Sequence, residues 1–403
     1  MKLLHTADLH LGKVLHEHSL IEDQRHVLRL LLAALKDPSF NALVIAGDVY
    51  DRSIPPPDAV RLFGPFLGQV KKECPALEVF LIAGNHDSAS RLGFGKELFA
   101  ELGVHVVTEP EDAFTPVVIT VGQEKTAFFM LPFLSAGSLK SALTHEEGQE
   151  PAPLRSQSLL AKEAAARLEK ARREAVEEGA DNTVLTAHLF AAGGFSSKSE
   201  RVFLGNAELV DSALFSGFDY VALGHLHKFQ KAGATAFYSG SPLAYSFSEA
   251  AHEKVFLAVT LEKGTAPRVE PVPITPLRKM TRLTGGFDSF WRDTMTDEVK
   301  ASASDYLEII LTDANLIENP LSRLNKRFPY LLSIDQGNAV AARLREGTAM
   351  AHDLNTRAMK KNEEQDIVDD FLDFLAEIHG QDDSFAEEAD LFKDILRETE
   401  VEQ

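Results

Sequence analysis

The chain has 403 residues, 44% of them hydrophobic and 25% charged, which is ordinary for a soluble globular protein and is enough for two domains or for one large domain with additions. Its single cysteine, Cys74, excludes an internal disulfide and favours a reducing compartment, and no apolar run reaches the roughly 20 residues of a membrane span. The net charge of −20 argues against a nucleic-acid-binding protein, but residues 362–403 alone carry −14 and the other 361 residues only −6, which leaves room for a local basic groove.

The N-terminal part alternates strand and helix patterns. The chain enters a strand directly, without the basic segment and long apolar stretch of a signal peptide, so we expect a cytoplasmic protein. Apolar strands are predicted at 2–7, 42–46 and 78–83, and helices at 19–36 and about 58–72. The order β-α-β-α-β indicates a parallel sheet with helices on its faces.

The middle of the chain predicts a second sheet. A hairpin is expected at 116–121 and 126–130, and the composition of residues 155–179 is strongly helical. Further strands are predicted at 183–187, 219–223, 235–239 and 255–260. We expect this second sheet to pack on the first.

Four prolines within residues 264–280 indicate a link between domains. Beyond them, strands at 305–311 and 330–334 enclose a partly helical stretch, which predicts a small α+β domain. We therefore divide the chain into a main domain, a small domain and an acidic tail, at residues 1–265, 275–345 and 353–403.

The tail has the residue spacing of two amphipathic helices separated by HGQDD, with Ser384 able to cap the second. Such helices either fold back on their own protein or dock on a partner. The first apolar face consists of Ile367, Phe371, Phe374, Leu375 and Ile378, and the second of Leu391, Phe392, Ile395 and Leu396.

Residues that can bind metal ions or transfer protons follow five of the predicted strands. In open α/β sheets, ligands bind at the carboxyl ends of the strands, so we expect these residues to share one site. One Asp-X-His or His-X-His pattern arises easily by chance, whereas five strand ends of this kind rarely do. The seven candidate ligands are Asp8, His10, Asp48, Asn85, His188, His225 and His227.

Such a set of donors suits two divalent ions about 3.5–4 Å apart, which can clamp the attacking and leaving oxygens of a phosphoester. With DLH, GDVYD, GNHD, AH and GHLH in this order, the chain resembles the calcineurin-like metallophosphoesterases. Longer stretches resemble the SbcD family, the nuclease subunits of bacterial SbcC–SbcD complexes, over residues 1–250. These are HTADLHLG, AGDVYDRSIPP, AGNHDS, LGHLHKFQ and YSGSPLAYSFSE.

The resemblance implies an α/β fold in which a metallophosphoesterase β-sandwich is flanked by helices, with a small α+β capping domain and a C-terminal helical tail. It also implies the division of the ligands. The first ion would take Asp8, His10 and His227, the second would take Asn85, His188 and His225, and Asp48 would bridge them. Mixed imidazole, carboxylate and amide ligands suit manganese, although zinc or iron would also fit.

Two further residues receive a catalytic role by the same resemblance. His86 would not bind metal but would face the scissile phosphate as proton donor or charge stabiliser, and Asp51 would orient it. A plain turn-stabilising pair is the alternative for these two residues. Lys198 and Arg201 are candidate contacts to DNA phosphates. Ala187 replaces the glycine that the family pattern has before His188.

The function implied is a manganese-dependent DNA nuclease, acting as a 3′-to-5′ exonuclease on duplex DNA and as an endonuclease on single strands and hairpins. The expected partner is an SbcC-like coiled-coil ATPase, with the chain as a homodimer within a heterotetramer. The sequence has no G-x-x-x-x-G-K-[ST] motif, so any ATP dependence would come from that partner. Two alternatives stay open: an esterase for a small phosphoester or cyclic nucleotide, and a non-enzymatic tether of DNA ends.

Overall fold

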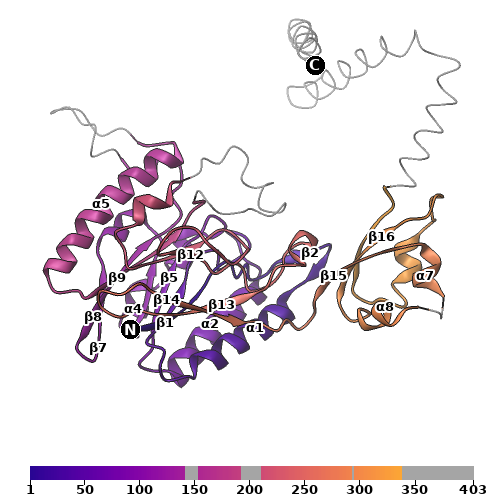
Figure 1. Ribbon diagram of the computed structural model, residues 1–403, viewed down its shortest axis with the longest axis horizontal. Helices are drawn as coiled ribbons and strands as arrows, with labels where there is room; N and C mark the ends of the chain where they lie inside the picture. The colour runs from indigo at the N-terminus through magenta and orange to yellow at the C-terminus, as the bar shows by residue number, and fades with distance from the viewer. Residues whose placement is uncertain (141–152, 192–209, 293–294, 338–403) are drawn as a thin grey trace, which may run out of the picture. The chain divides into compact units, whose positions relative to one another are not determined.

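A computed structural model describes residues 1–140, 153–191, 210–292 and 295–337 (Figure 1). The candidate DNA contacts Lys198 and Arg201 and the predicted helices of the acidic tail lie outside these residues. None of the helices within them is long and apolar enough to cross a membrane.

The first sheet has six strands in the order β14–β13–β1–β4–β5–β6. Its central strands are parallel, as the β-α-β-α-β pattern predicts, and β13 and β14 extend one edge in antiparallel pairing. The bounds are β1 Lys2–Thr6, β4 Ala42–Ile45, β5 Glu78–Ile82, β6 Val104–Val107, β13 Val255–Thr260 and β14 Arg268–Pro273.

The second sheet also has six strands, in the order β11–β12–β10–β9–β8–β7. Strands β8, β9, β10 and β12 run parallel, and β7 pairs with β8 as the predicted hairpin. The bounds are β7 Val117–Val121, β8 Glu124–Leu131, β9 Asn182–His188, β10 Tyr220–Gly224, β11 Gln230–Lys231 and β12 Ala236–Tyr238.

The two sheets pack face to face and share a buried core, which explains the continuous apolar runs of their strands. In β4, Val44 lies in the core between the sheets, whereas Leu43 and Ile45 face the helices on the other side. The rings of Phe80 and Phe128 stack across the sheets with centroids 3.9 Å apart. The predicted sandwich is therefore present.

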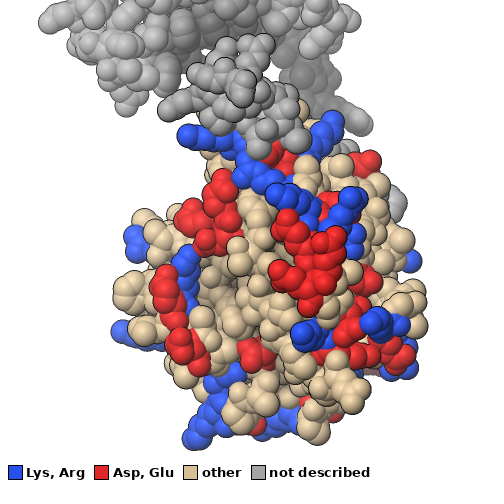
Figure 2. All heavy atoms as spheres, turned by 90° about the vertical axis from the view of Figure 1, so that its left-hand side faces the viewer, with Lys and Arg blue, Asp and Glu red and all other residues tan. Residues whose placement is uncertain are grey.

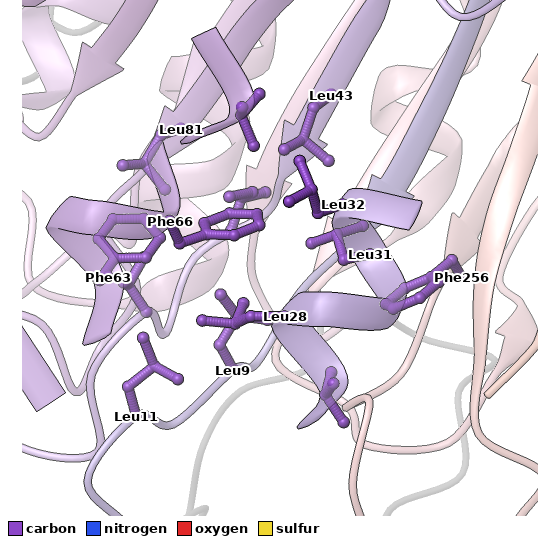
Figure 3. Close-up of a cluster of buried hydrophobic side chains, with 14 of the residues drawn as sticks. Leu9, Leu11, Leu28, Leu31, Leu32, Leu43, Phe63, Phe66, Leu81 and Phe256 are labelled. Carbon is purple, nitrogen blue, oxygen red and sulfur yellow. The ribbon is translucent and has the colours of Figure 1, made fainter. Parts of the chain in front are cut away.

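Helices cover the outer faces of both sheets. Helices α1 (Ile21–Leu35) and α2 (Pro57–Glu73) pack on the first sheet through leucines and phenylalanines such as Leu31 and Phe66 (Figure 3). Helix α5 (Gln157–Glu177) covers the second sheet (Figure 1), and its Leu160, Ala164 and Leu168 repeat every four residues along the buried side. The arrangement is the α/β sandwich flanked by helices that the sequence predicts.

The proline-rich stretch at 264–280 is not simply a link. Its residues Arg268–Pro273 form β14, paired with β13 from Val255↔Pro273 to Thr260↔Arg268. Strand β14 is the last strand at its edge, where prolines do not remove ladder hydrogen bonds. The prolines of this stretch are therefore compatible with an edge strand.

A third sheet has the order β15–β16–β17, with β15 Met280–Gly285, β16 Tyr306–Leu311 and β17 Leu331–Asp335. The remaining short elements are β2 Val14–Leu15, β3 His18–Ser19, α3 Ala89–Leu92, α4 Lys96–Ala100, η1 Pro110–Phe114, η2 Ser212–Phe215, η3 Phe247–Glu249, α7 Phe287–Trp291, α8 Asp297–Ala301 and α9 Pro320–Leu324.

The chain divides into two compact units. The first comprises Met1–Leu283, Arg292–Ile309 and Leu321–Ile334, and the second comprises Thr284–Trp291, Ile310–Pro320 and Asp335–Gln403. In the second unit, the backbone N–H of Phe287 donates to the Asp313 carboxylate at 2.7 Å, which fixes the start of α7. The predicted domain limits stay a prediction.

Candidate metal centre

The candidate ligands lie in the loops that follow β1, β4, β5 and β10 and, for His188, at the last residue of β9, and the structure brings these strand ends together. Direct hydrogen bonds join the two sheets there. The backbone N–H of His225 donates to both carboxylate oxygens of Asp8 at 3.0 and 3.1 Å, and Asn85 Oδ1 lies 3.0 Å from His188 Nε2. The site therefore lies where the carboxyl ends of both sheets meet.

Four of the seven candidate ligands have left-handed backbone conformations, which are rare for residues other than glycine. Their φ angles are 54° at Asp8, 42° at His10, 49° at Asp48 and 106° at His225. Neighbouring loops hold this strain in place: Asp8 N donates to Gly47 O and His10 N to Asp48 O, both at 3.0 Å. Strain of this kind concentrates at functional sites.

Two glycines allow the loops to approach this closely. A Cβ atom at Gly84 would lie 2.1 Å from Asp48 Oδ1, and one at Gly224 would lie 1.8 Å from the carbonyl oxygen of Ala46. By contrast, Ala187 lies inside β9 with its methyl group in the core under α5, so the strand accepts alanine where the family pattern has glycine.

The second-ion group, Asn85, His188 and His225, gathers around one oxygen atom. Asn85 Oδ1 lies 3.0 Å from both His188 Nε2 and His225 Nδ1. His188 Nδ1 donates to the carbonyl oxygen of Ala46 at 2.8 Å, so in the neutral ring Nε2 carries a lone pair. Imidazole nitrogens and an amide oxygen are all metal-ligand atoms, and here they lie within hydrogen-bond distance of one another, so the group fits a metal ion.

The first-ion group, Asp8, His10 and His227, has donor atoms that all lie within 4.8 Å of one another. Both ring nitrogens of His10 are buried and form no hydrogen bond within the described residues; they lie 3.4 Å from Asp51 Oδ1 and 3.6 Å from Asp48 Oδ2. A buried imidazole in this state needs a further partner, which a metal ion would supply.

Asp48 lies between the two groups. Its Oδ2 is 3.6 Å from His10 Nε2 and 3.5 Å from His188 Nε2. Asp48 also forms a cluster within 4.8 Å with Asp8 and His188, and another with His10 and His86. This position is the one that a bridging carboxylate would occupy.

The pKa values indicate a site that lacks positive charge. Burial, with the nearby Asp48, raises the pKa of Asp8 to about 7 against the opposing effect of His188 and His227. Burial would lower the pKa of His188, but Asp48 and Asp8 raise it to about 9. Divalent cations would stabilise both buried carboxylates, in keeping with the donor set.

His86 is partly buried beside the first-ion group, with its ring centroid 4.8 Å from that of His10. Its Nδ1 donates to the backbone carbonyl of Asp51 at 2.9 Å. The Asp51 carboxylate instead contacts Lys13 Nζ at 2.8 Å and His10 Nδ1 at 3.4 Å. Asp51 thus contacts His86 through its main chain rather than through the side chain that the sequence analysis proposed.

Sequence analysis missed three residues that surround the site and assigned no chemistry to a fourth. Glu249 and Tyr245 contact His227 of the first-ion group, and Lys254 pairs with Glu249. Two of them, Tyr245 and Glu249, lie within YSGSPLAYSFSE, so the sequence did carry a signal. Asp87 accepts hydrogen bonds from the N–H groups of Gly84, Val49 and Tyr50 at 2.9–3.0 Å and thereby ties two loops together.

The profile of the calcineurin-like phosphoesterases matches residues 1–229, more than half of the chain. The chain belongs to this family. Membership implies a metal-dependent phosphoester hydrolase, and the donor groups above are the part of the fold that can hold the metal.

Solved structures that the chain matches include TT1561 of Thermus thermophilus, at 12% sequence identity and a TM-score of 0.37, covering 68% of this chain and 99% of that one. A dimetal phosphatase from Danio rerio has 11% identity and a TM-score of 0.36, with 68% and 99% covered. The calcineurin-like phosphoesterase YfkN from Bacillus subtilis has 11% identity and a TM-score of 0.36, with 68% and 90% covered.

Proposed function

We propose that this phosphoesterase is a manganese-dependent DNA nuclease of the SbcD type, a 3′-to-5′ exonuclease on duplex DNA and an endonuclease on single strands and hairpins. The observation that carries the proposal is the convergence of the ends of β1, β4, β5, β9 and β10 on one site. The motifs around these strand ends are those that resemble the SbcD family.

The residues of the site would have separate roles in hydrolysis. Asp8, His10 and His227 would hold one ion and Asn85, His188 and His225 the other, with Asp48 between them. When bound, the ions would polarise the phosphoester and lower the pKa of a water molecule. His86, fixed by the Asp51 carbonyl, would donate a proton or stabilise charge at the leaving oxygen.

A polymeric substrate is supported by what lies beyond the family match. Residues 265–403 add the third sheet and the acidic tail, which an enzyme for small phosphoesters does not need. Acidic and basic side chains are interspersed on the face seen in Figure 2, so we do not place DNA on that face. Lys198 and Arg201 stay candidate contacts to DNA phosphates.

The test is cleavage of an end-labelled DNA hairpin by the purified chain with Mn²⁺, compared with bis-p-nitrophenyl phosphate and a cyclic nucleotide. Hairpin cleavage that disappears with EDTA supports the proposal. Hydrolysis of only the small esters would favour the alternative phosphoesterase. Two bound ions without hydrolysis of any substrate would favour the DNA-end tether.

We also propose that the chain works in the cytoplasm as a homodimer and binds an SbcC-like coiled-coil ATPase through its acidic tail. The dimer is supported by three exposed apolar side chains in and next to α4, Phe94, Leu98 and Leu102, which are 82%, 74% and 62% exposed. The ATPase is supported by the apolar stripes and the charge of the tail, which suit a basic coiled-coil groove.

A further inference from the structure

The segment that follows β12 surrounds the histidines of the first-ion group. The ring of Tyr245 lies with its centroid 5.2 Å from that of His10 and 5.7 Å from that of His227. Its hydroxyl donates to the carbonyl oxygen of Leu9, which fixes the ring against the loop after β1. Residues of one segment thus contact both imidazoles of this group.

Glu249 and Lys254 form a buried ion pair behind His227. Glu249 Oε1 lies 3.0 Å from His227 Nδ1, and Lys254 Nζ lies 2.8 Å from Glu249 Oε2. Lys254 Nζ also donates to the backbone carbonyl of His227 at 2.9 Å. Both the ring and the main chain of His227 are therefore held by the same pair.

In the second-ion group, the ring of His188 is held by a different kind of partner. His188 donates from Nδ1 to a neutral backbone carbonyl, that of Ala46, at 2.8 Å. A carboxylate behind an imidazole fixes its tautomer and makes the other nitrogen a stronger metal ligand than a carbonyl does. The two ions would consequently depend on different supporting residues.

We propose that Glu249, held by Lys254, is a positioning residue that sets the affinity of the first ion independently of the second. His227 Nδ1–H donates to Glu249, so Nε2 carries the lone pair that would join Asp8 and His10. This inference rests on the proposed two-ion centre, but not on DNA being the substrate.

The test is Mn²⁺ binding to full-length Glu249→Gln protein, measured by isothermal titration and by metal analysis after dialysis at fixed free Mn²⁺. We expect one of the two dissociation constants to rise about 10–100-fold while the other changes less than about threefold. His227→Ala provides the reference isotherm for a lost first-ion ligand. The matched control is Glu253→Gln, because Glu253 is exposed and lines the same cavity of about 370 Å³ as Glu249.

The double variant Glu249→Gln/Lys254→Met separates positioning from stability. Glu249→Gln leaves the Lys254 ammonium buried without its carboxylate and should lower the metal-free Tm; removing both charges should restore it. The Mn²⁺ affinity of the first ion should stay low in the double variant. Recovery of affinity together with Tm, or unchanged affinity in Glu249→Gln, would overturn the inference. A wild-type protein that binds fewer than two ions would overturn the two-ion centre and this inference with it.

Discussion

At the scale of single residues, the site places buried carboxylates and imidazoles close together. A positive charge between them would stabilise the carboxylates. Asp48 is central, because its Oδ2 lies within 3.6 Å of a histidine from each ion group. His86 lies at the edge of the same cluster but contacts the Asp51 main chain. Loss of Asp48 is therefore expected to remove both metal and activity, whereas loss of His86 is expected to lower activity alone.

Asp48→Ala should abolish phosphoester cleavage and lower the bound metal count below two per chain, because both ions would lose a ligand. The measurements are hydrolysis of bis-p-nitrophenyl phosphate and metal analysis of the dialysed protein. Full activity in this variant would contradict the bridging role. Asp58→Ala, an exposed aspartate of α2, is the control.

His86→Leu should lower kcat by roughly 10²–10⁴-fold, the usual contribution of a general acid, while metal content stays near that of the wild type. The readouts are steady-state kinetics and metal analysis on the same preparation. Loss of metal in proportion to activity would instead make His86 a ligand, as its cluster with His10 and Asp48 permits.

At the scale of elements, a glycine just beyond β5 and one at the end of β10 let neighbouring loops approach each other closely. The approach of the loop after β5 to Asp48 depends on Gly84, since an added Cβ would lie 2.1 Å from the carboxylate. The exposed Gly64, in the middle of α2, has no atom within 4 Å of such a Cβ. The same substitution should therefore have opposite effects at the two positions.

Gly84→Ala should weaken Mn²⁺ binding and lower the free energy of unfolding, because the loops after β4 and β5 must move apart. Gly64→Ala should leave metal binding unchanged and stabilise the protein by about 0.5–1 kcal/mol, since alanine is the better helix former. Urea unfolding in EDTA and Mn²⁺ titration test both. Normal Mn²⁺ affinity in Gly84→Ala would show that the loops tolerate the added methyl.

At the scale of the whole molecule, assembly is expected to involve the apolar residues around α4 and the acidic tail. Phe94, Leu98 and Leu102, in and next to α4, are exposed large apolar side chains within nine residues of one another. The acidic tail carries most of the net charge. Each surface gives a separate prediction.

If the proposed homodimer forms through the apolar residues around α4, Leu98→Glu should yield a monomer in sedimentation equilibrium, because a charge would be buried at a two-fold interface. Leu159→Glu is the matched control, since Leu159 is a half-exposed leucine on α5. The dimer proposal fails for the residues around α4 if Leu98→Glu sediments as the wild type does.

Deletion of residues 362–403 should preserve the metal count and Mn²⁺-dependent cleavage of single-stranded DNA by the isolated chain. It should abolish co-purification with the SbcC-like ATPase and ATP stimulation by it, because the apolar stripes and acidic rim would be lost. Phe371→Ala/Phe374→Ala should act in the same direction, with Thr399→Ala as control. Undiminished binding of the ATPase by the truncated chain would place the docking site elsewhere.

The sequence by itself determined most strands of the sandwich and the residues at their ends. Runs such as EVFLIAG predict buried strands because burial on both faces requires continuous apolar residues, and side-chain chemistry at the next positions is visible without coordinates. The four-residue strand β6 and the edge strand β14 escaped prediction, since one is short and the other carries two prolines.

Only the tertiary structure decided which neighbours support those residues. Glu249 lies 22 residues beyond His227, and its contact with the imidazole depends on how η3 and β13 pack, which no local pattern encodes. The same holds for the contact of Asp51 with His86, where the main chain replaces the expected carboxylate. A side chain's chemistry is set by its own residue type, whereas its partners and protonation are set by long-range packing and burial.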